Sequence, residues 1–338
     1  MEKILVEELV KFKMLPFDLF NEAGEKLVDA GEILTSGKLL QISQYDVLYK
    51  AAPKNQEESV PSQSAKPQQQ KRPEPIIQKV EYEPHKPKEI IFDKTVNRKS
   101  KFKAQSQVDM KSYYATTMFA MRENANKDAI QMVDEIKDKI LDDVQSIISD
   151  VKFCSQLKLL GNYQDCHSLN TAILATAMGY KLEYDEDIVE KLAQASLLHD
   201  IGVTRLPKEL WEKTTLSQQD NKIYATHTQI GYKILKYEMG MPEEICLVAL
   251  EHHENNDGSG YPFKLSGEQI SPLARIVGLC SFFDDLTSNR TTYKIKNTKE
   301  ALRVMLEVGS RRFFPQILYQ FVNMFNYNDL ESYDEMMQ

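Results

Sequence analysis

A stretch rich in proline and glutamine limits how this chain can fold, because it separates the chain into two parts. Seven of the 13 prolines lie between Pro53 and Pro87, together with the polar run Gln68-Gln69-Gln70. Residues 53–104 carry 12 Lys and Arg against 7 Asp and Glu. Such a segment buries too little apolar surface to offset the entropy lost on ordering. We predict a flexible linker at 53–104, with contact between its positive charge and RNA or acidic lipid as the alternative.

The composition of the whole chain is that of a globular protein. The 338 residues are 42% hydrophobic and 27% charged, and the net charge of −8 argues against a nucleic-acid polymer as partner. No apolar run approaches the ~18 residues needed for a membrane span, and the acidic N-terminus is unlike a signal peptide. The four cysteines have no paired spacing and are expected to be reduced thiols in a cytoplasmic protein. They are Cys154, Cys166, Cys246 and Cys280.

Residues 1–52 have the pattern of a small α+β domain. Short apolar runs alternate with turns at Gly24 and Gly31, which predicts hairpins. A helix is expected from about Thr35 to Ser43, followed by a strand at 47–49. No catalytic combination of residues occurs here. We expect a regulatory or interaction domain through which protein partners could bind, with a purely structural role as the alternative.

Residues 105–150 form an amphipathic helical lead-in to the second part of the chain. Apolar residues recur there at steps of three and four, separated by charged residues. These positions are Val133, Ile136, Ile140, Val144, Ile147 and Val151. A helix that packs on the following domain explains the spacing. A helix that forms a homodimer would have the same pattern, so both interpretations stay open.

The domain at 151–338 is predicted to be all-α, because no strand-like alternation of any length appears after residue 150. Asp185 could cap a helix over 186–198, and Ser217 with Asp220 resembles a capping box opening a helix to about Lys236. Pro242 and Pro272 stand at first helical turns and predict helices to about 254 and 288. Two more helices are expected at 298–308 and 315–326.

Five of the six histidines lie between residues 167 and 253, on four successive predicted helices or helix ends. They are His167, His199, His227, His252 and His253, and only His85 lies elsewhere. Each alone is better explained as a structural or surface residue, but together they suggest metal ligands, because neutral imidazole is the commonest such ligand. Asp200 stands in apolar sequence, where an unpaired buried carboxylate is costly. Five imidazoles and one carboxylate fit two metals bridged by the carboxylate.

These residues resemble the HD-GYP domain, a branch of the HD phosphohydrolases. The resemblance rests on His199-Asp200-Ile201-Gly202 with Leu206-Pro207, and on His252-His253-Glu254 leading to Gly258-Ser259-Gly260-Tyr261-Pro262. Around them, Tyr163 to Ser168, His227 with Gly231, and Asp284 to Thr287 are similar to further segments of the family. The resemblance covers about residues 150–330.

The resemblance implies a helical bundle that holds two, sometimes three, divalent transition metals, often iron or manganese. It implies hydrolysis of the bacterial second messenger cyclic di-GMP to pGpG and onward to GMP. Two metal sites would share Asp200, which would also position the attacking hydroxide. The first would use His167 and His199, and the second His227, His252 and His253. By the same resemblance, Gly260, Tyr261 and Pro262 would flank the nucleotide, and Arg290 and Lys294 would contact phosphate.

Two departures from the family pattern weaken the expectation of full activity. Val203 stands where the family usually has lysine, and Arg205 is a distant replacement. Ser281 stands where the family has a metal-binding aspartate, so the first site loses charge unless Asp284, one turn later, takes its place. Tyr163 supplies no further carboxylate for a third metal. The alternatives are a non-catalytic HD-GYP-like module that binds nucleotide or a protein partner, and an HD phosphohydrolase for another nucleotide.

Overall fold

The structure of the chain is a computed structural model, and it describes seven ranges of residues. These are 1–51 without 13 and 46, 113–118 without 116, 127–145, 163–211, 213, 216–288 and 298–325. The expected linker at 53–104 lies outside them, as do Cys154, Arg290 and Lys294. The three described cysteines are buried free thiols. Among the described residues, no helix combines the length and apolar character needed to cross a membrane.

The N-terminal region contains a small antiparallel sheet in the order β1-β4-β2-β3. Its strands are β1 (Glu2–Ile4), β2 (Asp18–Phe20), β3 (Lys26–Val28) and β4 (Leu48–Ala51). The predicted hairpin is β2–β3, and Gly24 in its turn has φ +79°, a conformation that glycine adopts without strain. Neither β1 nor α1 (Val6–Leu9) was predicted, because three or four residues are too few to establish a period.

Helix α2 (Ser36–Ile42) lies close to the predicted range, with Thr35 as its N-cap. The Thr35 hydroxyl accepts a hydrogen bond from the Lys38 amide, which satisfies one of the free donors of the first turn. Leu39, Leu40 and Ile42 are buried. The small α+β domain expected from the sequence is therefore present in the structure.

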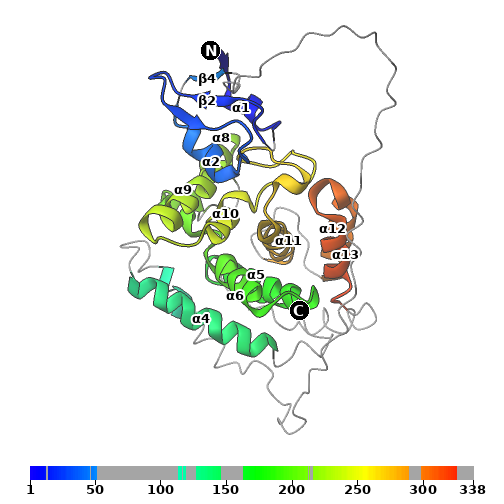
Figure 1. Cartoon of the computed structure of the whole chain (residues 1–338). Helices are drawn as coiled ribbons and strands as arrows, with labels where there is room; N and C mark the ends of the chain where they lie inside the picture. Colours follow the sequence, from blue (N-terminus) through cyan, green and yellow to red (C-terminus); the bar gives the residue numbers. More distant parts are fainter. Residues whose placement is uncertain are drawn as a thin grey trace, which may run out of the picture. The chain divides into compact units, whose positions relative to one another are not determined.

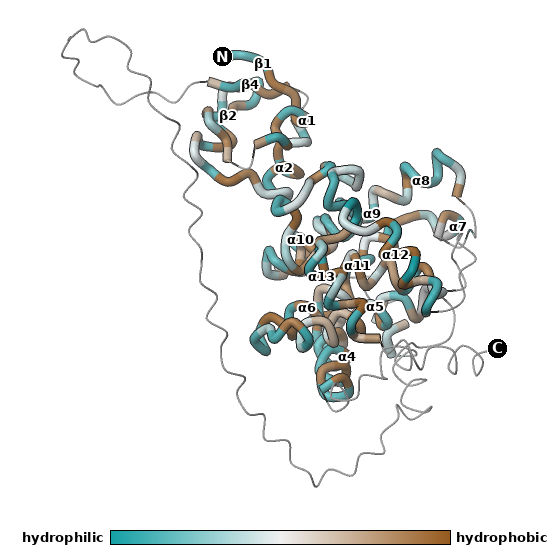
Figure 2. Tube along the Cα trace, turned by 90° about the vertical axis from the view of Figure 1, so that its right-hand side faces the viewer, coloured by the Kyte–Doolittle hydropathy of each residue, from teal (hydrophilic) through white to brown (hydrophobic). Residues whose placement is uncertain are grey.

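The rest of the described chain is a bundle of helices (Figure 1), as predicted. In chain order these are α4 (Lys127–Gln145), α5 (Tyr163–Lys181), α6 (Glu186–Leu198), η2 (Ile201–Arg205), α7 (Lys208–Trp211), α8 (Gln218–Ala225), α9 (His227–Lys233), η3 (Ile234–Glu238), α10 (Glu243–Glu251), η4 (Gly267–Gln269), α11 (Pro272–Thr287), α12 (Thr298–Arg312) and α13 (Pro315–Val322). Figure 2 shows apolar stretches in α10 and α11, whose side chains make much of the buried core.

Helix α4 buries the apolar positions that the sequence predicted, including Val133, Ile136 and Ile140. Gln194 on α6 donates a hydrogen bond of 2.7 Å to Asp134 on α4. The helix therefore packs on the bundle, which confirms one of the two interpretations of its spacing. The dimer interpretation stays a prediction.

One predicted helix is broken into two in the structure. The capping box of Ser217 and Asp220 is present, but the helix it opens stops at Ala225. The amide of Thr226 bonds to Ile223 in a tight turn, and His227 then begins a separate helix. Asp185 is the N-cap residue of α6, yet its side chain makes no capping hydrogen bond. The helix predicted at 298–308 is confirmed, because the first helical part of α12 ends at Gly309, where φ is +50°.

Candidate metal centre

Asp200 lies at the centre of the histidine cluster that the sequence predicted. His167 comes from α5, His199 and Asp200 from the end of α6, and His227 from the first position of α9. His252 and His253 follow the last turn of α10. These side chains form two groups that could each hold a metal ion, with Asp200 in both. The first contains His167, His199 and Asp200, and the second contains Asp200, His227, His252 and His253.

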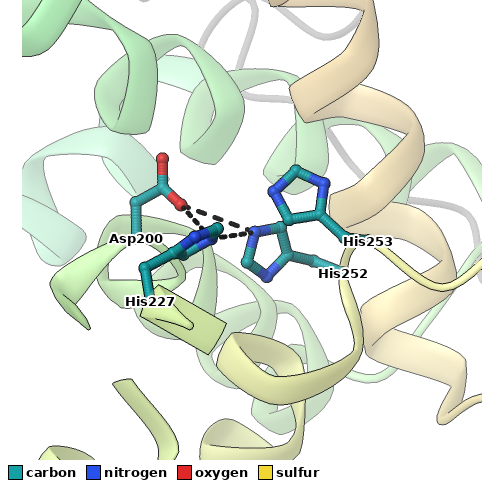
Figure 3. Close-up of side chains that lie close together, drawn as sticks. All are labelled: Asp200, His227, His252 and His253. Carbon is teal, nitrogen blue, oxygen red and sulfur yellow. Dashed lines mark hydrogen bonds and ion pairs between the residues drawn. The ribbon is translucent and has the colours of Figure 1, made fainter. Parts of the chain in front are cut away.

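Three nitrogen and oxygen atoms of the second group point at one another (Figure 3). Oδ1 of Asp200 lies 3.2 Å from Nε2 of His227 and 3.4 Å from Nε2 of His252. The two Nε2 atoms are themselves 3.4 Å apart. In each ring Nδ1 already faces a backbone carbonyl, of Tyr224 or of Val248 and Ala249, and a carbonyl can only accept. A neutral ring therefore presents a lone pair at Nε2, so that three electron-pair donors converge where a cation fits.

His199 is oriented in the same way. Its Nδ1–H donates to the carbonyl of Ser196 at 2.7 Å, and its Nε2 lies 3.6 Å from Oδ2 of Asp200. That Nε2 is buried without a hydrogen-bond partner. Buried polar atoms are rarely left unpaired, and a metal ion would satisfy this one. The residues present therefore fit a metal pair.

The protonation states of these groups suit metal binding. Burial lowers the pKa of His199 to about 3, and it also lowers the pKa of His252 and holds that of His253 well below its usual range. These rings are neutral near pH 7 and keep their lone pairs. Burial alone would raise the pKa of Asp200, but the surrounding imidazoles, first among them His199, hold it well below the ordinary value. Asp200 is therefore an ionised carboxylate beside the neutral rings of His199, His252 and His253.

His167 differs from the other histidines because a carboxylate holds its Nδ1. Asp284 Oδ2 lies 2.8 Å from that nitrogen, and Asn170 donates to the other carboxylate oxygen at 2.9 Å. Nε2 of His167 faces Ser281 Oγ at 3.2 Å and Asp200 at 3.9 Å. The structure thus places Ser281 beside the first group and leaves Asp284 outside both groups. This differs from the expectation that Asp284 replaces Ser281 as a ligand, because Asp284 contacts the other nitrogen of the ring.

The Asp284 contact also changes the titration of His167. Burial lowers its pKa, but the hydrogen bond with Asp284 and the charges of Asp285 and Asp200 outweigh this and raise the pKa to about 9. Without a metal, this ring is protonated at neutral pH.

Two glycines, Gly202 and Gly278, allow backbone to approach backbone next to the candidate ligands. A Cβ on Gly202 would lie 1.9 Å from the carbonyl oxygen of His227, and a Cβ on Gly278 would lie 2.5 Å from that of His252. No side chain fits at either distance. Glycine at these positions therefore brings η2 against α9, and α11 against the end of α10, which sets the spacing of the ligands.

The loop that follows His253 folds back over it. The Tyr261 ring stacks on the His253 ring, with centroids 4.7 Å apart and planes at 24°, and the Tyr261–Pro262 bond is cis. A Cβ on Gly260 would lie 2.4 Å from the amide nitrogen of Asn255, so this loop closes only with glycine there. The three loop residues expected to flank a nucleotide thus lie next to a predicted metal ligand.

A buried carboxylate fixes the second half of this loop. Glu254 accepts hydrogen bonds from the amides of Phe263 and Leu265, at 2.7 and 3.0 Å. Burial raises the pKa of Glu254 to about 7. The residue directly after the ligand pair therefore connects the metal centre to the segment 263–265.

Sequence reasoning missed several residues that support the site. Glu251 is buried and accepts hydrogen bonds from Ser36 Oγ on α2 and from the Ser271 amide at the start of α11. The carbonyls of Arg311 and Arg312 accept from the amides of Asp257 and Asn256. The sequence signal for Glu251 was a glutamate directly after the apolar run from Ile245 to Leu250. The partners are 20 to more than 200 residues away, so local patterns could not identify them.

Arg205, the possible replacement for the lysine that the family has at position 203, pairs with a residue outside the metal centre. Val203 is half-buried in η2, and the guanidinium of Arg205 pairs with Glu238 at 3.0 Å. Arg205 is thus paired with a carboxylate on η3. Arg312 is a cation that the sequence did not identify, and its guanidinium lies 3.9 Å from the centre of the Phe282 ring.

Comparison with known proteins places this centre in a family. Residues 153–317 match the family described as HD domain. The chain carries an HD-GYP domain. It is 35% identical over 195 residues to the cyclic di-GMP phosphodiesterase PA4108 of Pseudomonas aeruginosa, covering 57% of this chain and 46% of the relative. It is 30% identical over 174 residues to the cyclic di-GMP phosphodiesterase PdeB of Borreliella burgdorferi, covering 51% and 46%.

A solved structure supports the fold over most of the chain. The HD-GYP-type protein Bd1817 of Bdellovibrio bacteriovorus superposes with a TM-score of 0.53 at 14% identity, covering 94% of this chain and 97% of that one. At this identity the likeness concerns the fold alone. The chain spans about half the length of the curated relatives that it matches. The HD-GYP domain predicted from the motifs is therefore confirmed, and the activity of the whole protein is a separate question.

Proposed function

We propose that this protein is a metal-dependent phosphodiesterase that hydrolyses cyclic di-GMP to pGpG and GMP. The observation that carries the proposal is Asp200, an ionised carboxylate shared by two groups of potential ligands. Paired metals that share a carboxylate are the usual arrangement for in-line attack on a phosphodiester. Both curated relatives described above are named cyclic di-GMP phosphodiesterases, which supports the choice of substrate.

Two divalent metals, iron or manganese, would be held by the two groups. His167, His199 and Asp200 would hold one, and Asp200 with His227, His252 and His253 the other. Bound metals of this kind neutralise charge on phosphoryl oxygens and lower the pKa of water towards neutrality. The backbone carbonyls that accept from Nδ1 of His199, His227 and His252 would keep each Nε2 aimed at the metal.

The protein would position the nucleotide with the loop over His253. Gly260 permits the loop to close, Tyr261 presents a ring beside the ligand, and Pro262 fixes the chain direction after it. Arg290 and Lys294 remain proposed phosphate contacts and lie outside the described residues. In this scheme the nucleotide phosphate faces Asp200 and the histidines around it, while the loop excludes water from one side of the site.

We propose that the first metal is bound more weakly than the second. The second group has four ligands, whereas the first has three and a serine hydroxyl where the family has a carboxylate. Each proton or neutral group in place of a charged ligand weakens attraction for a divalent cation. The proposed enzyme is therefore slower than a relative with aspartate at position 281.

The second candidate function is a non-catalytic HD-GYP module that binds nucleotide or a protein partner. Ser281 and Val203 favour it, because both remove a charge that the family keeps. Under this alternative the second metal group would still form and the nucleotide would bind without being cleaved. Partners bound through the N-terminal domain, a homodimer formed by α4, and a cytoplasmic location are compatible with either function and remain proposals.

One experiment distinguishes the two functions. The full chain is loaded with Fe or Mn without oxygen, the metal per chain is measured, and cyclic di-GMP turnover is followed by separating pGpG and GMP. The enzyme predicts close to two metals and product that disappears in Asp200→Ala, which also lowers metal content at both sites. Fewer than two metals without product contradicts the enzyme, and bound but uncleaved cyclic di-GMP supports the module. A mixed guanine–adenine cyclic dinucleotide tests the third alternative, a different nucleotide substrate.

A further inference from the structure

A groove separates α1 of the N-terminal domain from the segment that follows the Tyr261–Pro262 bond. Its volume is about 700 Å³, within the range of small-molecule sites in proteins. Val6, Val10 and Lys11 line one wall. The other wall is formed by Pro262, Phe263, Lys264, Ser266 and Gln269. The side chain of Gln269 crosses between them and donates to the carbonyl of Val10 at 2.7 Å, so the two walls are connected.

The charge of this groove differs from that of the chain as a whole. Lys11 and Lys264 are both exposed, one on each wall. Among the residues that the structure describes, neither ammonium has an ion-pair or hydrogen-bond partner. None of the eight residues lining the groove is acidic. In a chain of net charge −8, two unpaired cations facing one groove favour an anion there.

The base of the groove is apolar. Val6, Val10, Pro262 and Phe263 are half-buried, so part of each side chain faces the open volume. A flat apolar ring would remove this surface from water, at roughly 25 cal/mol per Å² of area buried. The combination of apolar walls with a few charged groups is typical of sites for small organic ligands.

The backbone of Lys264 supports a binding role for its side chain. Its φ is +58°, a left-handed conformation that costs a residue with a side chain about 1 kcal/mol or more. The neighbouring amides of Phe263 and Leu265 both donate to Glu254, which holds this conformation in place. Because Glu254 follows His253 directly, a ligand on Phe263 and Lys264 would contact a segment anchored at the metal centre.

We propose that this groove is a second binding site, separate from the metal centre, for a small phosphate-bearing molecule with a planar ring, such as a mononucleotide. The phosphate lies between Lys11 and Lys264, and the ring lies on Val10 and Phe263. The linker of this same chain is the other conceivable occupant, but it carries 12 basic against 7 acidic residues and would be repelled by the two lysines. Such a ligand joins the N-terminal domain to the loop over His253.

GMP is the probe for this site, measured by isothermal titration calorimetry with the full chain. The titration uses Asp200→Ala, which removes the shared metal ligand, so that binding at the metal centre does not contribute. We expect GMP to bind to Asp200→Ala and its affinity to fall by roughly tenfold or more when Lys11→Ala and Lys264→Asn are added. Asparagine tolerates a positive φ, so the second change removes charge without adding backbone strain. Guanosine and inorganic phosphate, titrated separately, should each bind at least roughly tenfold more weakly than GMP.

A matched control removes two lysines elsewhere, Lys222→Ala and Lys233→Ala, and should leave GMP affinity unchanged. The absence of GMP binding to Asp200→Ala would overturn the proposal, and so would equal affinity with and without Lys11 and Lys264. Phosphate binding as tightly as GMP would overturn the role of the apolar base. Cyclic di-GMP turnover of Lys11→Ala/Lys264→Asn, with Asp200 intact, is measured in parallel and should equal that of the unchanged chain. If neither the unchanged chain nor Lys11→Ala/Lys264→Asn hydrolysed cyclic di-GMP, the proposed phosphodiesterase activity would be rejected, but the proposed groove site would not.

Discussion

The Asp284 carboxylate lies 2.8 Å from Nδ1 of His167, while Nε2 of the same ring faces Ser281 and Asp200. One ring thus connects a buried carboxylate to the predicted metal centre. Because Asp284 occupies the outer nitrogen, it orients His167 and adds negative charge to the ring. It leaves the position next to Nε2 to a serine hydroxyl. The strength of the first metal site therefore depends on residue 281.

Ser281→Asp should strengthen the first metal site, because it places a carboxylate beside Nε2 of His167. We expect the affinity for the first metal to rise by about tenfold or more, and turnover of cyclic di-GMP to rise with it. Metal per chain after dialysis against a chelator, together with the turnover rate, measures the effect. Ser281→Asn, of nearly the same size but uncharged, is the control. Equal metal content in both variants would contradict the weak-site proposal.

Metal binding at the first site should depend on pH. A pKa of about 9 means that His167 is protonated at pH 7 in the metal-free protein, so the metal must displace a proton. Affinity should therefore increase from pH 6.5 to 9 and level off above. Asp284→Asn removes the largest contact that raises this pKa, and the pH dependence should then become shallower. Metal titrations between pH 6.5 and 9.5 check the slope, and a pH-independent affinity in the unchanged chain would be incompatible with this explanation.

The same pKa predicts how the stability of the metal-free protein varies with pH. Because the folded pKa of His167 lies above the ordinary 6.5, the contact with Asp284 stabilises the fold fully below pH 6.5. That contribution is lost as pH rises through about 9. Urea unfolding of the metal-free chain at pH 6, 7.5 and 9 measures it, and Asp284→Asn should lose the dependence. If the free energy of unfolding instead increased from pH 6 to pH 9 in the unchanged chain and not in Asp284→Asn, the predicted direction would be wrong.

Gly260→Ala should reduce activity without unfolding the domain. An added Cβ would lie 2.4 Å from the Asn255 amide and 2.5 Å from the Cα of Glu254, so the loop must move away from His253. A displacement of about 1 Å beside a reacting group can cost roughly 10²-fold in rate. Ser259→Ala in the same exposed loop is the control, since it removes one exposed hydrogen bond. Turnover and metal content, measured together, separate loss of the loop from loss of metal.

Ser36→Ala should destabilise the contact between α2 and α10. The Ser36 hydroxyl donates to Glu251, and both residues are buried. Leaving this carboxylate with one fewer donor costs about 1–3 kcal/mol. Ser43→Ala on the same helix removes a hydroxyl that bonds only to the nearby Leu40 carbonyl, and should cost less. Denaturant unfolding measures both, and an equal effect would show that the Glu251 contact contributes nothing of its own.

The sequence by itself determined the helical class of the second half and most of its helices. Amphipathic spacing and first-turn prolines are local signals. The prolines predicted α10 and α11 close to their observed ends, and the spacing predicted a helix in the region that contains α4. The break at Thr226 was not predicted, because the residues around it, Tyr224-Ala225-Thr226-His227, include no proline or glycine that would end a helix. The three-residue strand β1 was missed because its partner β4 lies at the other end of the domain.

For the site, the sequence predicted which residues gather around Asp200, and the tertiary structure decided what each atom faces. The clustering of five histidines around Asp200 was visible from residue types and motif spacing. Which nitrogen of His167 meets Asp284, and that Glu251 binds Ser36, depended on helices that are distant in sequence but packed together. The type of each residue determines which hydrogen-bond donors and acceptors its side chain has, and residue types are known from the sequence alone. Their directions are set by packing, because a side chain takes the rotamer that its neighbours from other helices allow.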